Sequence, residues 1–420
     1  MDVSLRYGRE EVVVPVEPGR WLGSFSPRFA AGLARPEEAA LTSLRKPLGS
    51  PPLRELARGA RTAAILVSDL TRITRSDLFV KLLADELNAA GVPDGGIHVY
   101  LATGTHSRVD EAERHALLGE ALGRVDCIPH DPTDRGNLVD LGETSFGTPI
   151  RINRRVYESD VKVLTGRITH HYFAGFSGGR KAIAPGVSSL ETILANHKRV
   201  MNPQGGGRHP EVFLGSLDRN PVHLDLLEIA EAASPTFCLN TILNVEHEVT
   251  HFFGGDYRKV HEAGCKVADS LFRLELPQRA DVALASCGGW PYDISFMQVV
   301  KTIVAAERAV ADGGVLVLFG HCGRGLESGF LDWFRHDSLE ELNRDVLAHY
   351  NLKGHNSYWV KEILARIRIV FVSSLPDEPL ATMGFLPAHG PREAMTLAYD
   401  LVGRDASVLA IPYGNVTVFS

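Results

Sequence analysis

The chain has 420 residues, of which 44% are hydrophobic and 23% charged, and its formal net charge is −7. This composition is ordinary for a folded globular protein, and the scattered Lys and Arg residues exclude the basic patch of a protein that binds nucleic acid or an acidic membrane. The length predicts two or three domains with a sizeable core, and the charge favours a small-molecule partner.

Targeting and redox signals predict a cytoplasmic location. The N-terminal sequence MDVSLRYGREEVVVPV lacks the continuous apolar core of a signal peptide, and no apolar run approaches the length of a membrane span. The 5 cysteines are widely spaced and form no C-x-x-C pair. We therefore expect free thiols rather than disulfides or a structural zinc site.

Short apolar runs that alternate with helical patterns predict an α/β fold. After a hairpin within residues 1–16, the order of strand, polar loop and helix repeats, as is typical of a doubly wound sheet. The expected strands are 62–68, 97–102, 160–166, 237–245 and 249–253, and the expected helices are 77–90, 188–198 and 257–272.

The same pattern restarts after residue 275. Strands are expected at 280–286, 314–319, 407–412 and 415–419, and a helix is expected at 296–309. We predict two α/β domains with mainly parallel sheets and an active-site cleft between them. The predicted parts are a catalytic domain over 1–275 that carries any cofactor, a smaller α/β domain over 276–405, and C-terminal strands over 406–420 that could return to the first domain.

Polar residues follow two of the predicted strands. Asp69 and Arg72 come after the strand at 62–68, and the sequence Thr103-Gly104-Thr105-His106 comes after the strand at 97–102. Because α/β folds bind ligands at the carboxyl ends of their strands, Arg72 could bind a substrate carboxylate through two hydrogen bonds. Asp69 could hold a hydroxyl or orient the arginine. The alternative is a solvated turn or an internal ion pair.

The third strand leads into a Gly-rich stretch, His170 to Val187, which Asn196-His197 follows. Histidine and lysine transfer protons, bind metals or form covalent adducts, and glycine lets the backbone pass close to a ligand. A phosphate loop requires Gly before its Lys and Ser or Thr after it, whereas Lys181 lies between Arg180 and Ala182. The stretch therefore predicts a reactive site of another kind, in which backbone N–H groups could still bind a phosphate.

Two further motifs have competing interpretations. His247-Glu248-Val249-Thr250-His251 matches the H-E-x-x-H pattern of zinc hydrolases, but the surrounding residues alternate as in a hairpin. On a strand the two histidines would lie roughly 13 Å apart, too far to share one zinc ion. Gln298 and Lys301 share one face of the helix at 296–309, and they either point to solvent or close a cleft.

Together these motifs resemble the nickel-dependent lactate racemases and related 2-hydroxyacid racemases. The resemblance rests on Ser68–Arg72, Ala102–His106, His170–Val187 and Ala195–His197, with weaker support from Gln298–Lys301. It implies an isomerase with a nickel-pincer nucleotide (pyridinium-3,5-bisthiocarboxylic acid mononucleotide nickel), a small 2-hydroxyacid substrate, and separate cofactor-biosynthesis proteins that load it.

The resemblance also implies roles for individual residues. Lys181 would be tethered to the cofactor through a thioamide, and His197 would bind the nickel. His106 and His171 would be the general acid and base, Arg72 and Lys301 would hold the substrate carboxylate and hydroxyl beside Gln298, and His171 is preferred over His170 because of its distance from Lys181. The remaining cofactor-binding residues would be Asp69, near the ribose, together with Phe173, Gly178, Gly179 and Pro185.

The implied chemistry moves hydrogen as a hydride from C2 of the hydroxyacid to the pincer carbon and so avoids a carbanion. One histidine removes the hydroxyl proton, a planar 2-oxoacid forms, and the opposite histidine serves the opposite enantiomer. This sequence departs from the lactate enzymes at Ile73, Arg75 and Met297. An added arginine could pair with a second carboxylate, so malate is a candidate beside lactate. The alternatives are a zinc hydrolase that uses His247 and His251, or a non-catalytic cofactor-binding member of the family.

Overall fold

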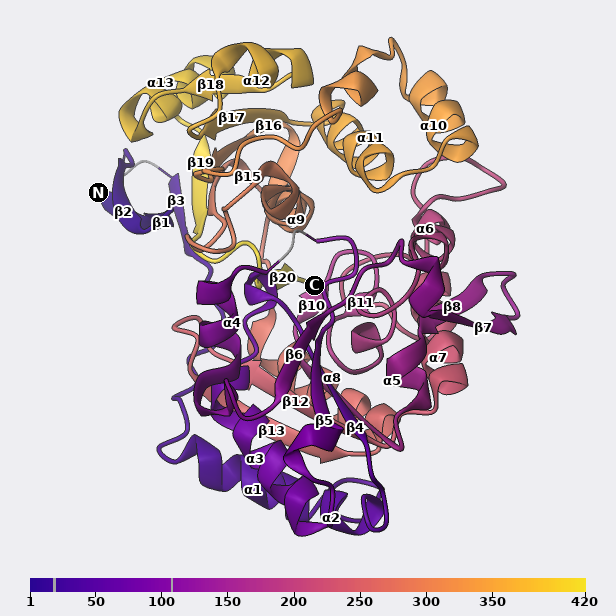
Figure 1. Ribbon diagram of the computed structural model, residues 1–420. Coiled ribbons are helices and arrows are strands. Elements are labelled where there is room, and N and C mark those ends of the chain that lie inside the picture. The colour runs from indigo at the N-terminus through magenta and orange to yellow at the C-terminus, as the bar shows by residue number, and fades with distance from the viewer. Residues whose placement is uncertain (18–19, 107–108) are drawn as a thin grey trace. The chain divides into compact units, whose positions relative to one another are not determined.

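The computed structural model describes residues 1–17, 20–106 and 109–420 (Figure 1). The chain divides into two compact units. The large unit comprises residues 29–199 and 211–271, and the small unit comprises residues 1–28, 200–210 and 272–420. None of the helices in these described ranges is long and apolar enough to cross a membrane.

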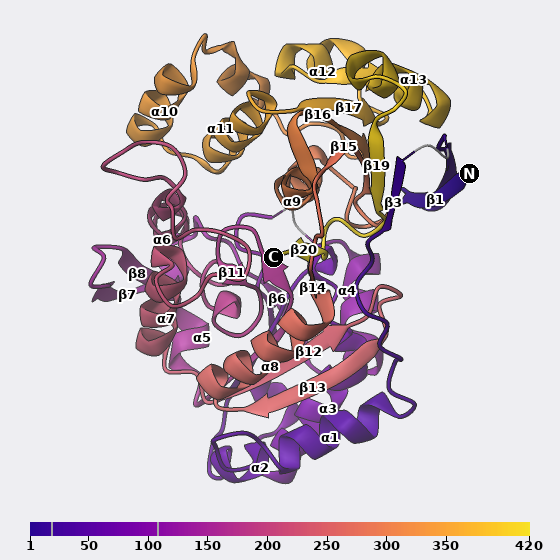
Figure 2. The same cartoon turned by 180° about the vertical axis from the view of Figure 1, so that it is seen from behind.

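The large unit contains a six-stranded sheet in the order β13-β12-β9-β4-β5-β6. Its strands are β4 (Ala63–Val67), β5 (Ile97–Leu101), β6 (Asp126–Pro129), β9 (Val161–Arg167), β12 (Phe237–Leu243) and β13 (Val249–Gly255). Neighbouring strands are parallel except for β12 and β13, which form an antiparallel pair that Figure 2 shows from behind. The strands predicted for this unit are thereby confirmed.

Apolar runs without alternation explain why this sheet is buried on both faces. All five residues of β4 are buried. One face packs in a core with α1 (Pro36–Arg45), α3 (Ser76–Ala89) and α4 (Glu111–Leu118). The other large-unit elements are α2 (Leu53–Leu56), β7 (Leu138–Glu143), β8 (Pro149–Asn153), α5 (Arg154–Glu158), β10 (His170–His171), β11 (Gly175–Phe176), α6 (Leu190–His197), α7 (Pro221–Ala233) and α8 (Tyr257–Phe272).

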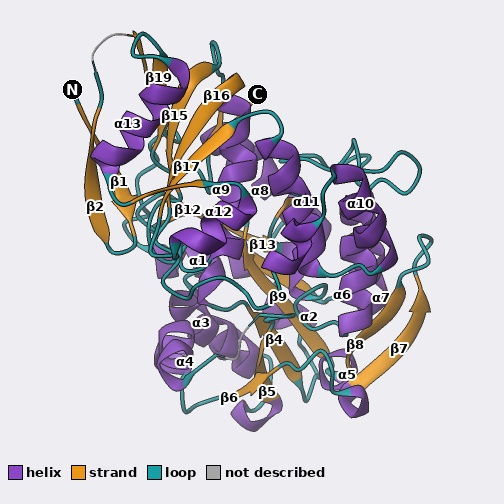
Figure 3. Ribbon diagram, turned by 90° about the horizontal axis from the view of Figure 1, so that it is seen from above, coloured by secondary structure: helices purple, strands orange, loops and turns teal. Residues whose placement is uncertain are grey.

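The small unit contains a second six-stranded sheet, in the order β18-β17-β16-β15-β19-β3, and all of its neighbouring strands are parallel. Its strands are β3 (Arg20–Ser24), β15 (Ala280–Ser286), β16 (Val310–Phe319), β17 (Arg368–Val372), β18 (Leu386–Ala388) and β19 (Ser407–Ile411). Alternate apolar residues of this sheet pack in a core with α13 (Pro391–Val402), which Figure 3 shows beside β15 to β17. The remaining small-unit elements are the hairpin β1 (Asp2–Tyr7) and β2 (Glu10–Pro15), α9 (Phe296–Ala306), α10 (Leu339–Ala348), α11 (Leu352–Leu364), α12 (Asp377–Met383), and the pair β14 (Arg273–Leu274) and β20 (Val418–Phe419).

The units differ from the predicted segments in two places. β3 pairs with β19 in the second sheet, and Val3, Leu5 and Val14 lie in the core of that sheet, so residues 1–28 belong to the small unit. The strand at 407–411 also lies in the second sheet, which corrects the expectation that the C-terminal strands could return to the first domain. Both differences arise because parallel pairing joins segments that are distant in the chain, which periodicity alone does not reveal.

Candidate functional site

Three neighbouring strands of the large unit lead into the predicted site loops. β4 lies between β9 and β5, and all three are parallel, so their carboxyl ends share one edge of the sheet. Asp69 follows β4, His106 follows β5, and His171 follows β9. The topology therefore places at one edge of the sheet side chains that are separated in sequence, as is typical of ligand sites in α/β folds.

Asp69 and His106 form a direct pair. The Oδ2 atom of Asp69 lies 2.7 Å from Nδ1 of His106. Asp69 begins the 3₁₀ turn Leu70–Arg72, and its Oδ1 accepts hydrogen bonds from the Thr71 backbone N–H at 2.8 Å and the Thr71 hydroxyl at 2.5 Å. Burial alone would raise the pKa of Asp69, but His106, Arg72 and Thr71 outweigh it and hold the pKa below its usual value. The carboxylate is therefore ionised and fixed in place.

The two adjacent histidines have different partners. The Nε2 atom of His170 lies 2.9 Å from a carboxylate oxygen of Asp269 in α8, and its ring packs on Phe176. The Nε2 atom of His171 instead lies 3.1 Å from the Lys181 amine, while its Nδ1 accepts weak hydrogen bonds from the backbone N–H groups of Phe173 and Ala174. His171 is thus the histidine next to the predicted tether.

Lys181 lies in a short 3₁₀ turn, Gly179–Ala182, which Gly178 begins. Burial, together with the charges of Arg72 and Arg180, lowers the pKa of its amine well below the usual value. Gly178 has φ +81°, and a Cβ there would lie 2.8 Å from Ile168 Cγ1 and 3.2 Å from the Arg167 carbonyl oxygen. A side chain at this position would therefore displace the turn that presents Lys181.

The ring of Phe173 connects three of the predicted residues. Its centroid lies 5.2 Å from the Lys181 amine, 4.4 Å from the His171 ring and 4.9 Å from the His197 ring. Phe173 and His197 are both buried. The structure therefore groups the predicted tether, one predicted acid/base residue and the predicted metal ligand around a single aromatic ring.

The loop that carries His106 contacts the same Gly-rich stretch. The Gly104 N–H donates to the Gly186 carbonyl at 3.0 Å, and a Cβ on Gly104 would lie 3.1 Å from the Cβ and carbonyl oxygen of Pro185. Gly104 also has φ +56°, which favours glycine. Pro185 thus contacts the loop of one predicted acid/base residue and follows the tether by four positions.

Two regions of the chain match sequence models of known protein domains. Residues 7–207 match the lactate racemase N-terminal domain, and residues 276–419 match the lactate racemase C-terminal domain. The chain is 31% identical, over 98% of both sequences, to the lactate racemases of Thermoanaerobacterium thermosaccharolyticum and Lactiplantibacillus plantarum. The chain belongs to the lactate racemase family.

Solved structures agree with this assignment to the lactate racemase family. The lactate racemase apoprotein from Thermoanaerobacterium thermosaccharolyticum matches with a TM-score of 0.90 and 28% identity over 100% of both chains. A protein from Thermotoga maritima shares the fold, with a TM-score of 0.70 and 19% identity over 91% of this chain and 98% of that one. The predicted α/β fold with mainly parallel sheets is therefore confirmed.

Three polar residues that support the site of this lactate racemase family member carry no signal in the sequence. Arg180 is fully buried, and its guanidinium donates to the carbonyls of Ala174 and Phe176 at 3.0 and 3.1 Å and lies 2.5 Å from Nε2 of His261. Burial lowers the pKa of Arg180 to about 10, and burial together with the Arg180 charge lowers the pKa of His261 well below its usual value. The carboxylate of Asp225 in α7 accepts a hydrogen bond of 2.8 Å from the side-chain amide of Asn196, the residue before His197.

The remaining sequence motifs of this family member are also accounted for. His247 lies in the turn between β12 and β13, and His251 lies in β13, so the hairpin is confirmed and the helix that a zinc hydrolase needs is not formed there. Over the residues that the structure describes, no group of three or more His, Cys, Asp or Glu side chains could hold a metal ion. Arg75 pairs with Asp77 at 3.1 Å.

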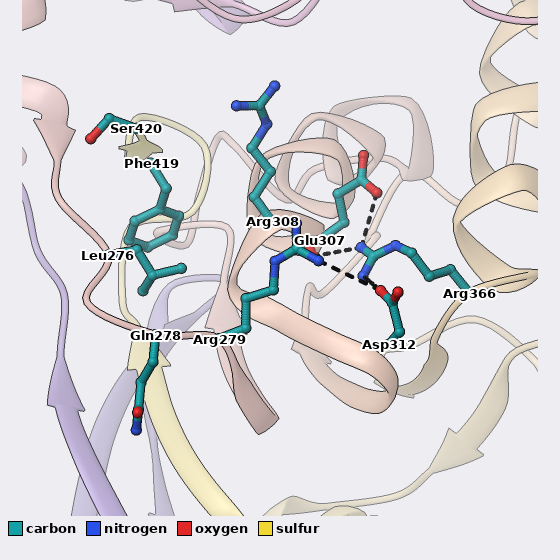
Figure 4. A pocket seen from close by; sticks show the side chains of 9 residues that line it. All are labelled: Leu276, Gln278, Arg279, Glu307, Arg308, Asp312, Arg366, Phe419 and Ser420. Carbon is teal, nitrogen blue, oxygen red and sulfur yellow. Dashed lines mark hydrogen bonds and ion pairs between the residues drawn. The ribbon is translucent and has the colours of Figure 1, made fainter.

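The small unit carries the last two predicted residues. The Lys301 amine donates to the Gln298 amide oxygen at 2.5 Å, one turn apart on α9 as predicted. Figure 4 shows a separate pocket of this unit, in which Arg366 bridges Glu307 and Asp312. Neither Gln298 nor Lys301 lines that pocket. The roles of both residues in the family chemistry stay predictions.

Proposed function

We propose that this chain is a 2-hydroxyacid racemase, with lactate as its first candidate substrate, that works with a nickel-pincer nucleotide tethered to Lys181. Relatives at 31% identity that are lactate racemases support the reaction class. The observation that carries the proposal is the placement of two histidines after β5 and β9, the parallel strands on either side of β4, with His106 paired to Asp69 and His171 next to Lys181.

The residues present fit such a cofactor. A thioamide bond requires an unprotonated amine, and the lowered pKa of Lys181 meets this need. Phe173 offers an aromatic surface beside Lys181 and His197, and imidazole is a donor that nickel accepts. Gly178 and Gly179 would let the backbone approach a planar group, Asp69 and Pro185 would complete the cofactor contacts, and His197 would bind the metal.

When bound, the cofactor supplies an acceptor for the hydride of C2. Side chains of the protein would transfer the hydroxyl proton of the substrate and bind its carboxylate. One of His106 and His171 would take the hydroxyl proton of one enantiomer and keep it, and the other, which would have to be protonated beforehand, would donate its own proton to the carbonyl oxygen after the planar 2-oxoacid has turned. Arg72 would bind the carboxylate through two parallel hydrogen bonds. The roles of Gln298 and Lys301 rest on the resemblance of their motif.

Lactate is placed before malate because of the surroundings of Arg75. Its guanidinium is already paired with Asp77, so binding a second substrate carboxylate would require that ion pair to open. A dicarboxylate substrate therefore gains less from Arg75 than the sequence alone suggests.

One experiment tests the proposal against its two alternatives. The chain is produced with and without the cofactor-biosynthesis proteins, and its metal content and intact mass are measured before a chiral screen of lactate, malate, phenyllactate, 2-hydroxybutyrate and gluconate. A racemase contains about one nickel ion per active chain, gains mass at Lys181 and interconverts enantiomers only when loaded. A zinc hydrolase would contain zinc that depends on His247 and His251, and a non-catalytic member would gain the mass but leave every enantiomer unchanged.

A further inference from the structure

The pair formed by Asp69 and His106 has the arrangement of an oriented general base. An ionised carboxylate only accepts hydrogen bonds, so the 2.7 Å contact between Asp69 Oδ2 and His106 Nδ1 requires a proton on Nδ1. A neutral imidazole carries one ring proton, and Nε2 is then left with a free lone pair. The tautomer of His106 is thus determined by its neighbour.

The carboxylate itself is also held through its other oxygen, Oδ1. Asp69 is 6% exposed, and its other oxygen accepts both the backbone N–H and the hydroxyl of Thr71. His106 is 36% exposed at its side chain, so the ring is not enclosed by the protein. A fixed, buried carboxylate behind a half-exposed imidazole positions that ring without blocking its far nitrogen.

We infer that Asp69 is a positioning residue for His106, which it holds with Nδ1 protonated and Nε2 ready to accept the hydroxyl proton of the substrate. This inference rests on the proposed function and replaces contact with a cofactor ribose as the main role of Asp69. A role in ribose binding alone would require no bond to His106, whereas this bond is among the shortest that either residue makes.

The first arm of the test uses the apoprotein and needs no activity. Histidine is labelled with ¹⁵N, the His106 signals are identified by their loss in His106→Gln, and long-range ¹H–¹⁵N spectra show which ring nitrogen is protonated. We expect protonated Nδ1 and bare Nε2 in the native protein, and loss of this single tautomer in Asp69→Asn, because an amide can donate as well as accept. A native signal with protonated Nε2, or an unchanged His106 in Asp69→Asn, would overturn the inference.

The chain offers a matched control for this arm. Asp269 pairs with His170 at 2.9 Å, a similar bond between the same residue types in the same unit. Asp269→Asn should alter the His170 signals and leave those of His106 unchanged. If both substitutions disturb His106 equally, the effect is a general loosening of the large unit and the positioning role is wrong.

The second arm uses cofactor-loaded protein, with rates expressed per loaded chain from the intact mass. Asp69→Asn should lower kcat by about 10²–10⁴-fold, the range that a misdirected general base produces, while KM changes little. A raised KM with unchanged kcat would instead assign Asp69 to binding and overturn the inference. If the native loaded protein turns over no 2-hydroxyacid, the proposed function fails, while the tautomer spectra still decide whether Asp69 positions His106.

Discussion

Lys181 combines a partly buried position with an amine that is proposed to react with the cofactor. Burial removes water from an ammonium group, and the nearby Arg72 and Arg180 repel it, so both causes lower the pKa of Lys181 and favour the neutral amine. The contact with His171 at 3.1 Å keeps that amine in one place. Both features suit the covalent attachment that is proposed for this residue.

The apoprotein should therefore show a Lys181 amine that loses its proton at a lower pH than the amine of an ordinary lysine. Trace labelling with acetic anhydride, followed by peptide mass spectrometry, measures the reactivity of each lysine as a function of pH. The rate at Lys181 should reach its plateau at a lower pH than the rate at an ordinary lysine. The same residue in the urea-unfolded chain is the control, because an ordinary lysine has a pKa near 10.4 and its rate rises about tenfold per pH unit below that pH.

Arg72→Ala tests the electrostatic part of this explanation. Removing one of the two repelling cations should raise the pKa of Lys181 and move the onset of its labelling to higher pH. A labelling profile for Lys181 that is the same in the native protein and in the unfolded chain would contradict the prediction, and it would also remove one support for the tether.

At the scale of elements, a buried carboxylate connects α6 to α7. Asp225 is fully buried and accepts hydrogen bonds from Thr144, Thr148 and Asn196, and it pairs with Arg199 at 3.2 Å. Asn196 precedes His197, so this network holds the end of α6 that presents the proposed metal ligand. Its partners come from separate segments of the chain, and their sequence spacing gives no indication that they meet.

Asp225→Ala should lower the free energy of unfolding by about 3–5 kcal/mol. The substitution removes the ion-pair partner of the Arg199 guanidinium and the acceptor of three hydrogen bonds, from Thr144, Thr148 and Asn196. Denaturant unfolding followed by circular dichroism measures this loss. Glu228→Ala is the matched control on the same helix, since Glu228 accepts from Ser145 at an exposed position and its loss should cost about 1 kcal/mol. Equal losses for the two variants would show that Asp225 is no special anchor.

These elements also show what the sequence could and could not predict. The strands that carry Asp69, His106 and His171 were predictable because uninterrupted apolar runs end in polar loops, and the hairpin around His247 was predictable from alternation. The buried polar residues Arg180 and Asp225 were not predictable, since arginine and aspartate are most often surface residues and nothing in the sequence around them indicates burial. β3 was missed because Arg20–Ser24 is short and only half-buried, and its partner β19 lies almost 400 residues later.

At the scale of the molecule, the small unit is assembled from both ends of the chain. β3 forms one edge of its sheet through β19, and Val3, Leu5, Val14 and Val16 of the N-terminal segment lie in its core. Burying an aliphatic side chain contributes about 1.5–3 kcal/mol, so four of them contribute roughly as much as the net stability of a typical domain. The predicted division at residue 275 would separate these residues from the core that they complete.

A fragment of residues 272–420 should therefore be poorly folded alone and become more stable when a peptide of residues 1–28 is supplied. The comparison is made by circular dichroism and urea unfolding with and without the peptide, and binding is followed by the fluorescence of Trp21, which lies in β3. A peptide with Leu5→Asp and Val14→Asp is the control, because it keeps the length of the segment but places charges where the core is apolar. If the fragment unfolds at the same urea concentration with either peptide or with none, the N-terminal segment is only an accessory of this sheet. A gain that only the native peptide provides would show that the second domain is encoded by two ends of the chain, with the proposed catalytic loops encoded between them.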